Sequence, residues 1–218
     1  HSVNELPQVL NPASGFLLNT NSTPRTVTTG SDLERAQFPA YMIGSEEDNA
    51  RAKASRRILT ERETFDFEQW SVAATDSRIQ IADEVLPRLI AAMDSLKMRD
   101  PARATKLEPD YKVLLAWDRK SSTGSVGMTL FHRMMTSGGT NGALIDGLER
   151  AVDALRREWG STSVPWGQLN LLQRRHWSGY QGDSCLIGST LRRAMPIGVS
   201  CGAVACALAR SAMSAYSR

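Results

Sequence analysis

Apolar residues recur at helical spacing in two long segments of the 218-residue chain. From residue 79 to residue 93 they lie three or four positions apart, which predicts an amphipathic helix, and Pro87 inside this segment predicts a kink or a break. Residues 144–159 keep the same spacing, carry arginines on the polar side and stop before Gly160, a typical residue after a helix end. Both segments are therefore expected to be surface helices that pack through one face.

Shorter elements are predicted elsewhere. Residues 49–59 have the composition of a helix, and Thr64 is a suitable N-cap for the helix after it. The short apolar run at residues 16–18 stands among Pro, Gly, Asn and Thr, which is typical of a strand bounded by turns. Residues 113–135 predict a short buried segment, a turn and another helix. Helix is expected to exceed strand by a wide margin.

The composition is that of an ordinary globular protein, with 41% hydrophobic and 22% charged residues. A formal net charge of +3, spread evenly along the chain, does not indicate a nucleic-acid or anionic-membrane partner. No run of 18 apolar residues is present, so no membrane span is predicted. Because His1 is neither an initiator Met nor the start of a signal peptide, we expect the numbering to begin inside a longer precursor.

The C-terminal residues differ in kind from the rest, which suggests a division into residues 1–177 and a tail, residues 178–218. Asp183 is the last acidic residue, and the tail is rich in Ser and Ala. It also holds the cysteines, whose spacing matches no metal or redox motif: Cys185, Cys201 and Cys206. The tail is interpreted either as the product of an altered reading frame or as a genuine divergent end.

Generic catalytic motifs are missing: the sequence has no G-x-S-x-G, H-E-x-x-H, P-loop or G-x-G-x-x-G pattern. The histidines, His1, His132 and His176, have no carboxylate or cysteine at a spacing that indicates a site. For His132 and His176 a surface or packing role is expected. No metal and no cofactor is predicted.

One long pattern is more specific. Residues 6–24 read LPQVLNPASGFLLNTNSTP, in which an N-P-x-x-G run leads into N-x-N-x-x-P. This resembles the penicillin amidase family, most closely its acyl-homoserine lactone acylase and aculeacin acylase branch. The resemblance continues, in the same order, at ARAKASRRIL, ADEVLPRL, LLAWDRKSSTGSVGMTLF and VPWGQLNLLQR, and so covers residues 6–175.

The resemblance implies an α+β fold, the αββα sandwich of the N-terminal nucleophile hydrolases, of which this chain would be an interior, helix-rich part of the β chain with strands around residues 11–21. It implies an amide hydrolase that removes the acyl group from a small N-acyl amine such as an N-acyl homoserine lactone, a β-lactam or a lipopeptide. The serine nucleophile, whose own α-amino group acts as base, would lie upstream of His1, so this chain alone is expected to be inactive.

The resemblance also implies a zymogen whose processed α chain is a partner, and a periplasmic or secreted location. The expected ligand is a small N-acyl amide, with neither nucleic acid nor membrane as a partner. The alternative from a different class is a non-catalytic binding domain that retains the acylase scaffold. A Gly-Ser processing site upstream of His1 would favour the enzyme.

Two site residues follow from the resemblance. Asn21 corresponds by its place in N-x-N-x-x-P to the oxyanion-hole asparagine, whose neutral amide can donate to the oxygen that becomes negative during amide hydrolysis. Arg51 corresponds to an arginine that supports the active site, with Arg57 six residues later on the same helix. Each has a simpler interpretation: Asn21, like Asn19, as a turn residue, and Arg51 as an exposed helix arginine paired with an acidic neighbour, namely Glu46, Glu47 or Asp48.

Overall fold

The computed structural model describes residues 2–31, 33–39, 41–42, 48–139, 143–172 and 195–196. The chain divides into two compact units, His1–Asp76 and Ser77–Arg218, and each is considered by itself. Among the described residues helix is far more common than strand, as the hydrophobic spacing predicts.

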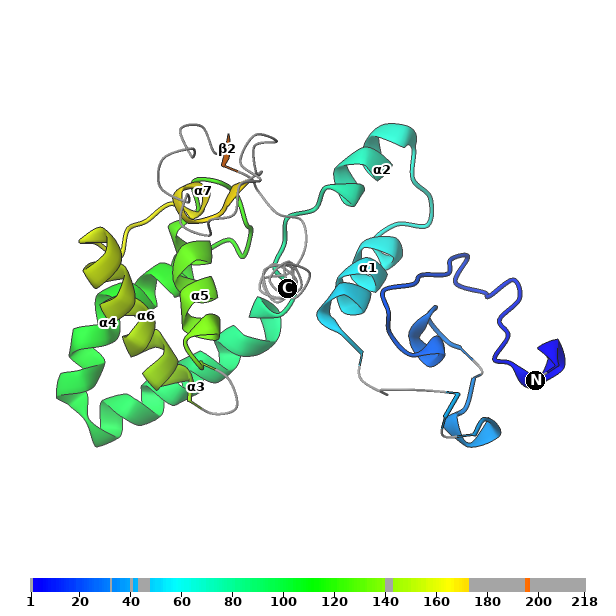
Figure 1. The fold of residues 1–218 in the computed structure, drawn as a ribbon, viewed down its shortest axis with the longest axis horizontal. Helices are drawn as coiled ribbons and strands as arrows, with labels where there is room; N and C mark the ends of the chain where they lie inside the picture. Colours follow the sequence, from blue (N-terminus) through cyan, green and yellow to red (C-terminus); the bar gives the residue numbers. More distant parts are fainter. Residues whose placement is uncertain are drawn as a thin grey trace, which may run out of the picture. The chain divides into compact units, whose positions relative to one another are not determined.

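The second unit is a bundle of long helices, drawn from green to yellow in Figure 1. These are α3 (Ala82–Arg99), α4 (Pro101–Ala116), α5 (Val126–Thr136) and α6 (Leu144–Trp159). Consecutive helices pack as pairs, α3 with α4 and α5 with α6, and the pairs pack on each other. The short helix α7 (Trp166–Leu169) and the strand β1 (Leu171–Leu172) follow, and β1 pairs antiparallel with β2 (Met195–Pro196).

One apolar core joins these helices. It contains side chains from α3, α4, α5 and α6, among them Leu89, Leu107, Phe131 and Leu148, which are fully buried. The predicted helix at residues 144–159 is confirmed with the same bounds, and Gly160 ends it at a left-handed φ of 70°. The predicted turn and helix within residues 113–135 are also confirmed by α5 and the connection before it.

The helix does not break at Pro87, so that part of the prediction is wrong: α3 runs through this residue without interruption. Pro87 is exposed, while Leu86 and Leu89 beside it are buried. Its missing N–H therefore leaves a carbonyl on the solvent side of the helix, where water can satisfy it, and the packed face is not disturbed. The sequence pattern does not predict the long helix α4, because its apolar face is weakly patterned and Pro109 lies inside it.

An ionic network joins the start of α3 to the α4–α5 connection. Arg78 Nη2 donates to Asp83 Oδ1 at 2.9 Å, and Arg119 Nη1 donates to the same oxygen. Partial burial would raise the pKa of the Asp83 carboxyl, but the hydrogen bonds from Arg119 and Arg78 hold that pKa below its ordinary value. A β-bridge between Arg78 and Lys120 lies beside this network and connects the two segments through their backbones.

Among its described residues, the first unit contains the helices α1 (Ala50–Thr60) and α2 (Phe67–Ala74) and the short 3-10 turns η1 (Val3–Glu5), η2 (Pro24–Thr26) and η3 (Arg35–Gln37). The helix predicted at residues 49–59 is confirmed by α1. Thr64 is not the N-cap of α2: Asp66 accepts the N–H of Gln69 at 2.8 Å, and the Gln69 side chain accepts the N–H of Asp66 at 3.2 Å. This reciprocal pair satisfies two free amide donors at the helix start, which Thr64 cannot do.

The strand predicted at residues 16–18 is wrong. Residues 16–18 pair with no strand among the described residues. Within the described part of the chain, their backbone is held by one backbone-to-backbone hydrogen bond, from the Leu18 N–H to the Val27 carbonyl at 2.7 Å. Left-handed backbone at Asn11, Gly15 and Asn21 turns the chain repeatedly around it. An extended run without a neighbouring strand cannot satisfy its amides as a sheet would, so it remains irregular.

The tail, residues 178–218, lies outside the described residues except for Met195 and Pro196. The three cysteines and His176 also lie outside the described residues, so what the sequence predicts for them stays a prediction. The αββα sandwich expected from the resemblance remains a prediction, since the regular structure described here is almost entirely helical.

Candidate functional site

The turn that carries Asn21 is held by its own side chains. Asn19 Oδ1 accepts the N–H of Asn21 at 3.0 Å, which closes an Asx turn. Asn21 itself has a left-handed φ of 58°, a conformation that asparagine tolerates better than most residues. Thr23 then caps the 3-10 turn η2 by accepting the N–H of Arg25. The expectation that Asn19 is a turn residue agrees with this geometry.

The first turn of α1 contacts this Asn21 turn through side chains. Asn49 is the N-cap of α1, and its Oδ1 accepts the N–H of Ala52 at 3.0 Å. Arg51 is the second residue of the helix, and its Nη2 donates to Asn21 Oδ1 at 3.0 Å. The two residues named from the sequence as a candidate site are thus directly hydrogen-bonded, although 30 positions separate them.

This contact determines which end of the Asn21 amide is free to donate. A guanidinium has only donors, so the atom facing Arg51 must be the amide oxygen. The amide is planar, and its Nδ2 therefore points away from the guanidinium. Since the amide does not ionise, Nδ2 remains a neutral donor over the whole working pH range.

The simpler interpretation of Arg51 can be compared with the contacts of its neighbours. Asp48, one of the acidic partners suggested for it, pairs instead with Arg56. Glu46 and Glu47 lie outside the described residues. Arg51 is solvent-exposed, as that interpretation expects, and its hydrogen bond goes to Asn21.

Two residues that the sequence did not indicate also connect α1 to the segment around Asn21, Asn49 at the Asn21 turn and Arg56 at η2. Asn49 Nδ2 donates to the Thr20 carbonyl at 2.9 Å. Arg56 Nη1 donates to the Thr26 carbonyl at 3.0 Å, and burial lowers the pKa of the Arg56 guanidinium. An Asn directly before a helical segment is a recognisable N-cap signal, but its second bond, to a carbonyl 29 residues earlier, has no signal in the sequence.

Arg57 has a different role from Arg51. Its Nη1 donates to Glu61 Oε1 at 2.5 Å, and its Nη2 pairs with Asp76. Although burial opposes the shift, the hydrogen bonds from Arg57 to Asp76 and Glu61 raise the pKa of the guanidinium. The Arg57 cluster therefore links α1 to the residues that follow α2.

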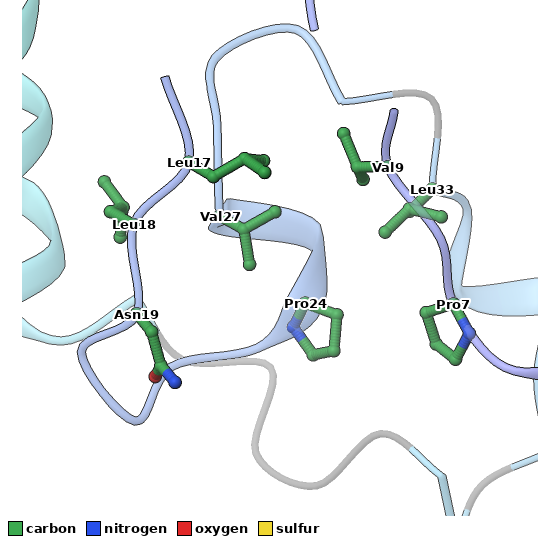
Figure 2. Close-up of a pocket in the computed structure, with 8 residues that line it drawn as sticks. All are labelled: Pro7, Val9, Leu17, Leu18, Asn19, Pro24, Val27 and Leu33. Atoms are coloured by element: carbon green, nitrogen blue, oxygen red, sulfur yellow. The ribbon is translucent and has the colours of Figure 1, made fainter. Parts of the chain in front are cut away.

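A shallow apolar hollow of about 330 Å³ lies beside the Asn21 turn (Figure 2). Pro7, Leu17, Val27 and Leu33 contribute to its walls, and Asn19 is its polar member. The hollow is open to solvent, and Leu17 is 57% exposed. The hollow therefore brings partly exposed apolar surface next to the polar turn at Asn19.

Other candidate chemistry is weak in the described residues. His132 lies on α5 with its ring 5.0 Å from the ring of Trp166, which agrees with a packing role. The described residues contain no group of His, Cys, Asp and Glu that could hold a metal ion. Among the described helices none is both long and apolar enough to cross a membrane.

Comparison with protein families agrees with the pattern of residues 6–24. The family model described as Penicillin amidase matches residues 1–216, which is nearly the whole chain. The five sequence blocks, the Asn21 turn and α1 all lie within the matched range. Members of this family are amide hydrolases, and the chain belongs to the penicillin amidase family.

Proposed function

We propose that this chain provides the oxyanion-stabilising part of an acylase that hydrolyses small N-acyl amines. Membership of the penicillin amidase family supports amide hydrolysis in general. The observation that supports the finer proposal is the hydrogen bond from Arg51 Nη2 to Asn21 Oδ1, which leaves Asn21 Nδ2 as a directed donor. The proposed substrates are N-acyl homoserine lactones, β-lactams or lipopeptides.

In the proposed reaction, a serine hydroxyl attacks the carbonyl carbon of the substrate amide. The carbonyl oxygen gains negative charge as the tetrahedral intermediate forms, and Asn21 Nδ2 donates a hydrogen bond to it. Collapse of the intermediate breaks the C–N bond, the amine leaves with a proton, and water then releases the acyl group from the serine. By family resemblance the nucleophile is the N-terminal serine of the β chain, and its own α-amino group accepts the proton.

Arg51 contributes in two ways to this proposal. It holds the Asn21 side chain in one orientation, so that little reorganisation is needed when charge develops on the substrate. Its positive charge also polarises the amide by withdrawing electron density through Oδ1, which makes the Nδ2 protons better donors. In this arrangement the group that donates to the oxyanion is neutral, and the positive charge acts on it through the bond from Arg51.

The proposed enzyme is made as a zymogen and is periplasmic or secreted. After processing, this chain associates with the α chain of the same precursor. Its test is the release of free amine by the complete processed enzyme from a panel of N-acyl homoserine lactones, a β-lactam and a lipopeptide, followed with an amine-reactive dye. Release of intact homoserine lactone would support an acylase. No amine release from any substrate would favour the non-catalytic binding domain.

A further inference from the structure

We propose that Asn49 is a positioning residue of this site, which ties the backbone of the Asn21 turn to the first turn of the helix that carries Arg51. This inference rests on the proposed oxyanion role of Asn21 and deepens it. Asn49 touches neither substrate nor reacting atoms in this proposal. It acts through the geometry of Asn21 and Arg51.

The two ends of the Asn49 amide bond to different segments. Oδ1 accepts the N–H of Ala52 at 3.0 Å, and Nδ2 donates to the carbonyl of Thr20 at 2.9 Å. Ala52 directly follows Arg51, and Thr20 directly precedes Asn21. One planar amide therefore spans the two residues of the candidate site through their neighbours' backbones.

Capping alone does not require asparagine at this position. Asp66, Asp100 and Ser125 cap other helices of this chain with an acid or a hydroxyl, and these residue types cap helices about as well as asparagine. A carboxylate lacks a donor, and a serine hydroxyl is too short to replace an amide that reaches in both directions. The donor end of Asn49 is thus explained by the bond to Thr20, not by the helix.

The bond to Thr20 matters because of the backbone at the next residue. Asn21 stands at a left-handed φ of 58°, and its side chain must meet Arg51 at hydrogen-bond distance. Rotation of the Thr20–Asn21 peptide plane would turn the Asn21 N–H away from Asn19 Oδ1 and so open the turn that carries the Asn21 side chain. Holding the Thr20 carbonyl opposes this rotation, so the donor Nδ2 of Asn21 keeps its direction.

The test uses Asn49→Asp and Asn49→Ser in the complete processed enzyme. Both variants retain a helix cap and lose the amide donor to Thr20. Asn49→Asp also adds a negative charge near Arg51, and the neutral Asn49→Ser separates that effect from the loss of the donor. Each variant is measured alone and combined with Asn21→Ala, for kcat, KM and thermal melting.

If the inference holds, each variant lowers kcat by about 10- to 100-fold while KM changes by about twofold or less, as expected for a small displacement of a group that acts in the transition state. In the Asn21→Ala background the same changes should cause no further loss, because Asn49 acts through Asn21. Unchanged kcat in both variants would overturn the inference. So would a full additional loss in the Asn21→Ala background.

Asp66→Ala is the matched control for helix capping in the same unit. It removes the cap of α2 and should lower the melting temperature without changing kcat. Failure of both Asn49 variants to fold, or a melting loss as large as that of Asp66→Ala, would assign Asn49 to stability alone and overturn the inference. If Asn21→Ala itself keeps wild-type kcat, the proposed function of Asn21 fails instead.

Discussion

The guanidinium of Arg51 donates from Nη2 to Oδ1 of Asn21 at 3.0 Å. This bond joins the second residue of α1 to a turn near the start of the chain, and it gives the Asn21 amide one orientation. The turn that carries Asn21 is held by its Asx hydrogen bond and by the bonds of Arg51 and Asn49.

Asn21→Ala should lower kcat of the complete enzyme by about 10²- to 10³-fold, as expected for the loss of one oxyanion donor. Asn11→Ala is the matched control, because Asn11 is also exposed and also has a left-handed φ, of 47°. Both variants place Ala in the same unfavourable backbone region, so both should lose similar stability. Equal kcat in the two variants would remove Asn21 from the mechanism.

Arg51→Lys keeps the positive charge but loses the planar guanidinium, so we expect kcat to fall by about tenfold with a smaller change in KM. Arg56→Lys is a useful comparison, since Arg56 contacts the Thr26 carbonyl of the same segment rather than Asn21. Steady-state kinetics on one N-acyl amide measures both. Wild-type kinetics for Arg51→Lys would favour the interpretation of Arg51 as an exposed helix residue.

Gly127→Ala should destabilise the second unit by roughly 1–3 kcal/mol, the usual cost of overpacking a core. A Cβ at Gly127 would overlap the side chain of Trp117, a ring packed against Phe131, and neither ring can move freely. Gly124→Ala, in the connection just before α5, is the control, because a Cβ there would meet no described residue within 4 Å apart from its chain neighbours. Urea denaturation measures the difference, and equal free energies of unfolding would contradict the packing seen here.

Asp83 should make the second unit sensitive to acid. Its folded pKa is depressed below the ordinary aspartate value of about 3.9, so its stabilisation is present above that pH and is lost as the pH falls through the lower folded pKa. The free energy of unfolding should therefore fall more steeply with acid in the wild type than in Asp83→Asn. Asp94→Asn, on the same helix but 65% exposed, is expected to behave as the wild type.

Hydrogen exchange on the 218-residue chain should differ between segments. Amides of α3 and α6 are expected to exchange slowly, because their helices share a fully buried apolar core. Amides of residues 2–31 should exchange faster, since this segment has exposed side chains such as Leu10, 87% exposed, and few backbone hydrogen bonds. Equal protection in both segments, read by mass spectrometry, would contradict the local stabilities inferred from burial.

Much of the helical structure could be predicted because it depends on local pattern. The spacing of apolar residues and the stop at Gly160 located α6 with its correct bounds. The predictions were wrong where the local structure depends on segments that lie beside it only in the folded chain. Pro87 is tolerated because it lies on the solvent side of α3, and residues 16–18 form no strand because no second strand pairs with them among the residues described. Neither fact is contained in the local sequence.

The sequence by itself determined the family pattern, the positions of the main amphipathic helices and the choice of Asn21 and Arg51 as candidates. Only the tertiary structure decided that these two side chains meet, and that Asn49 bonds to the Thr20 carbonyl and Arg56 to the Thr26 carbonyl. The physical reason is that a hydrogen bond between residues 30 positions apart requires the chain to close a long loop. Periodicity and composition describe residues a few positions apart, whereas the direction of the Asn21 donor is decided by partners that folding brings from α1.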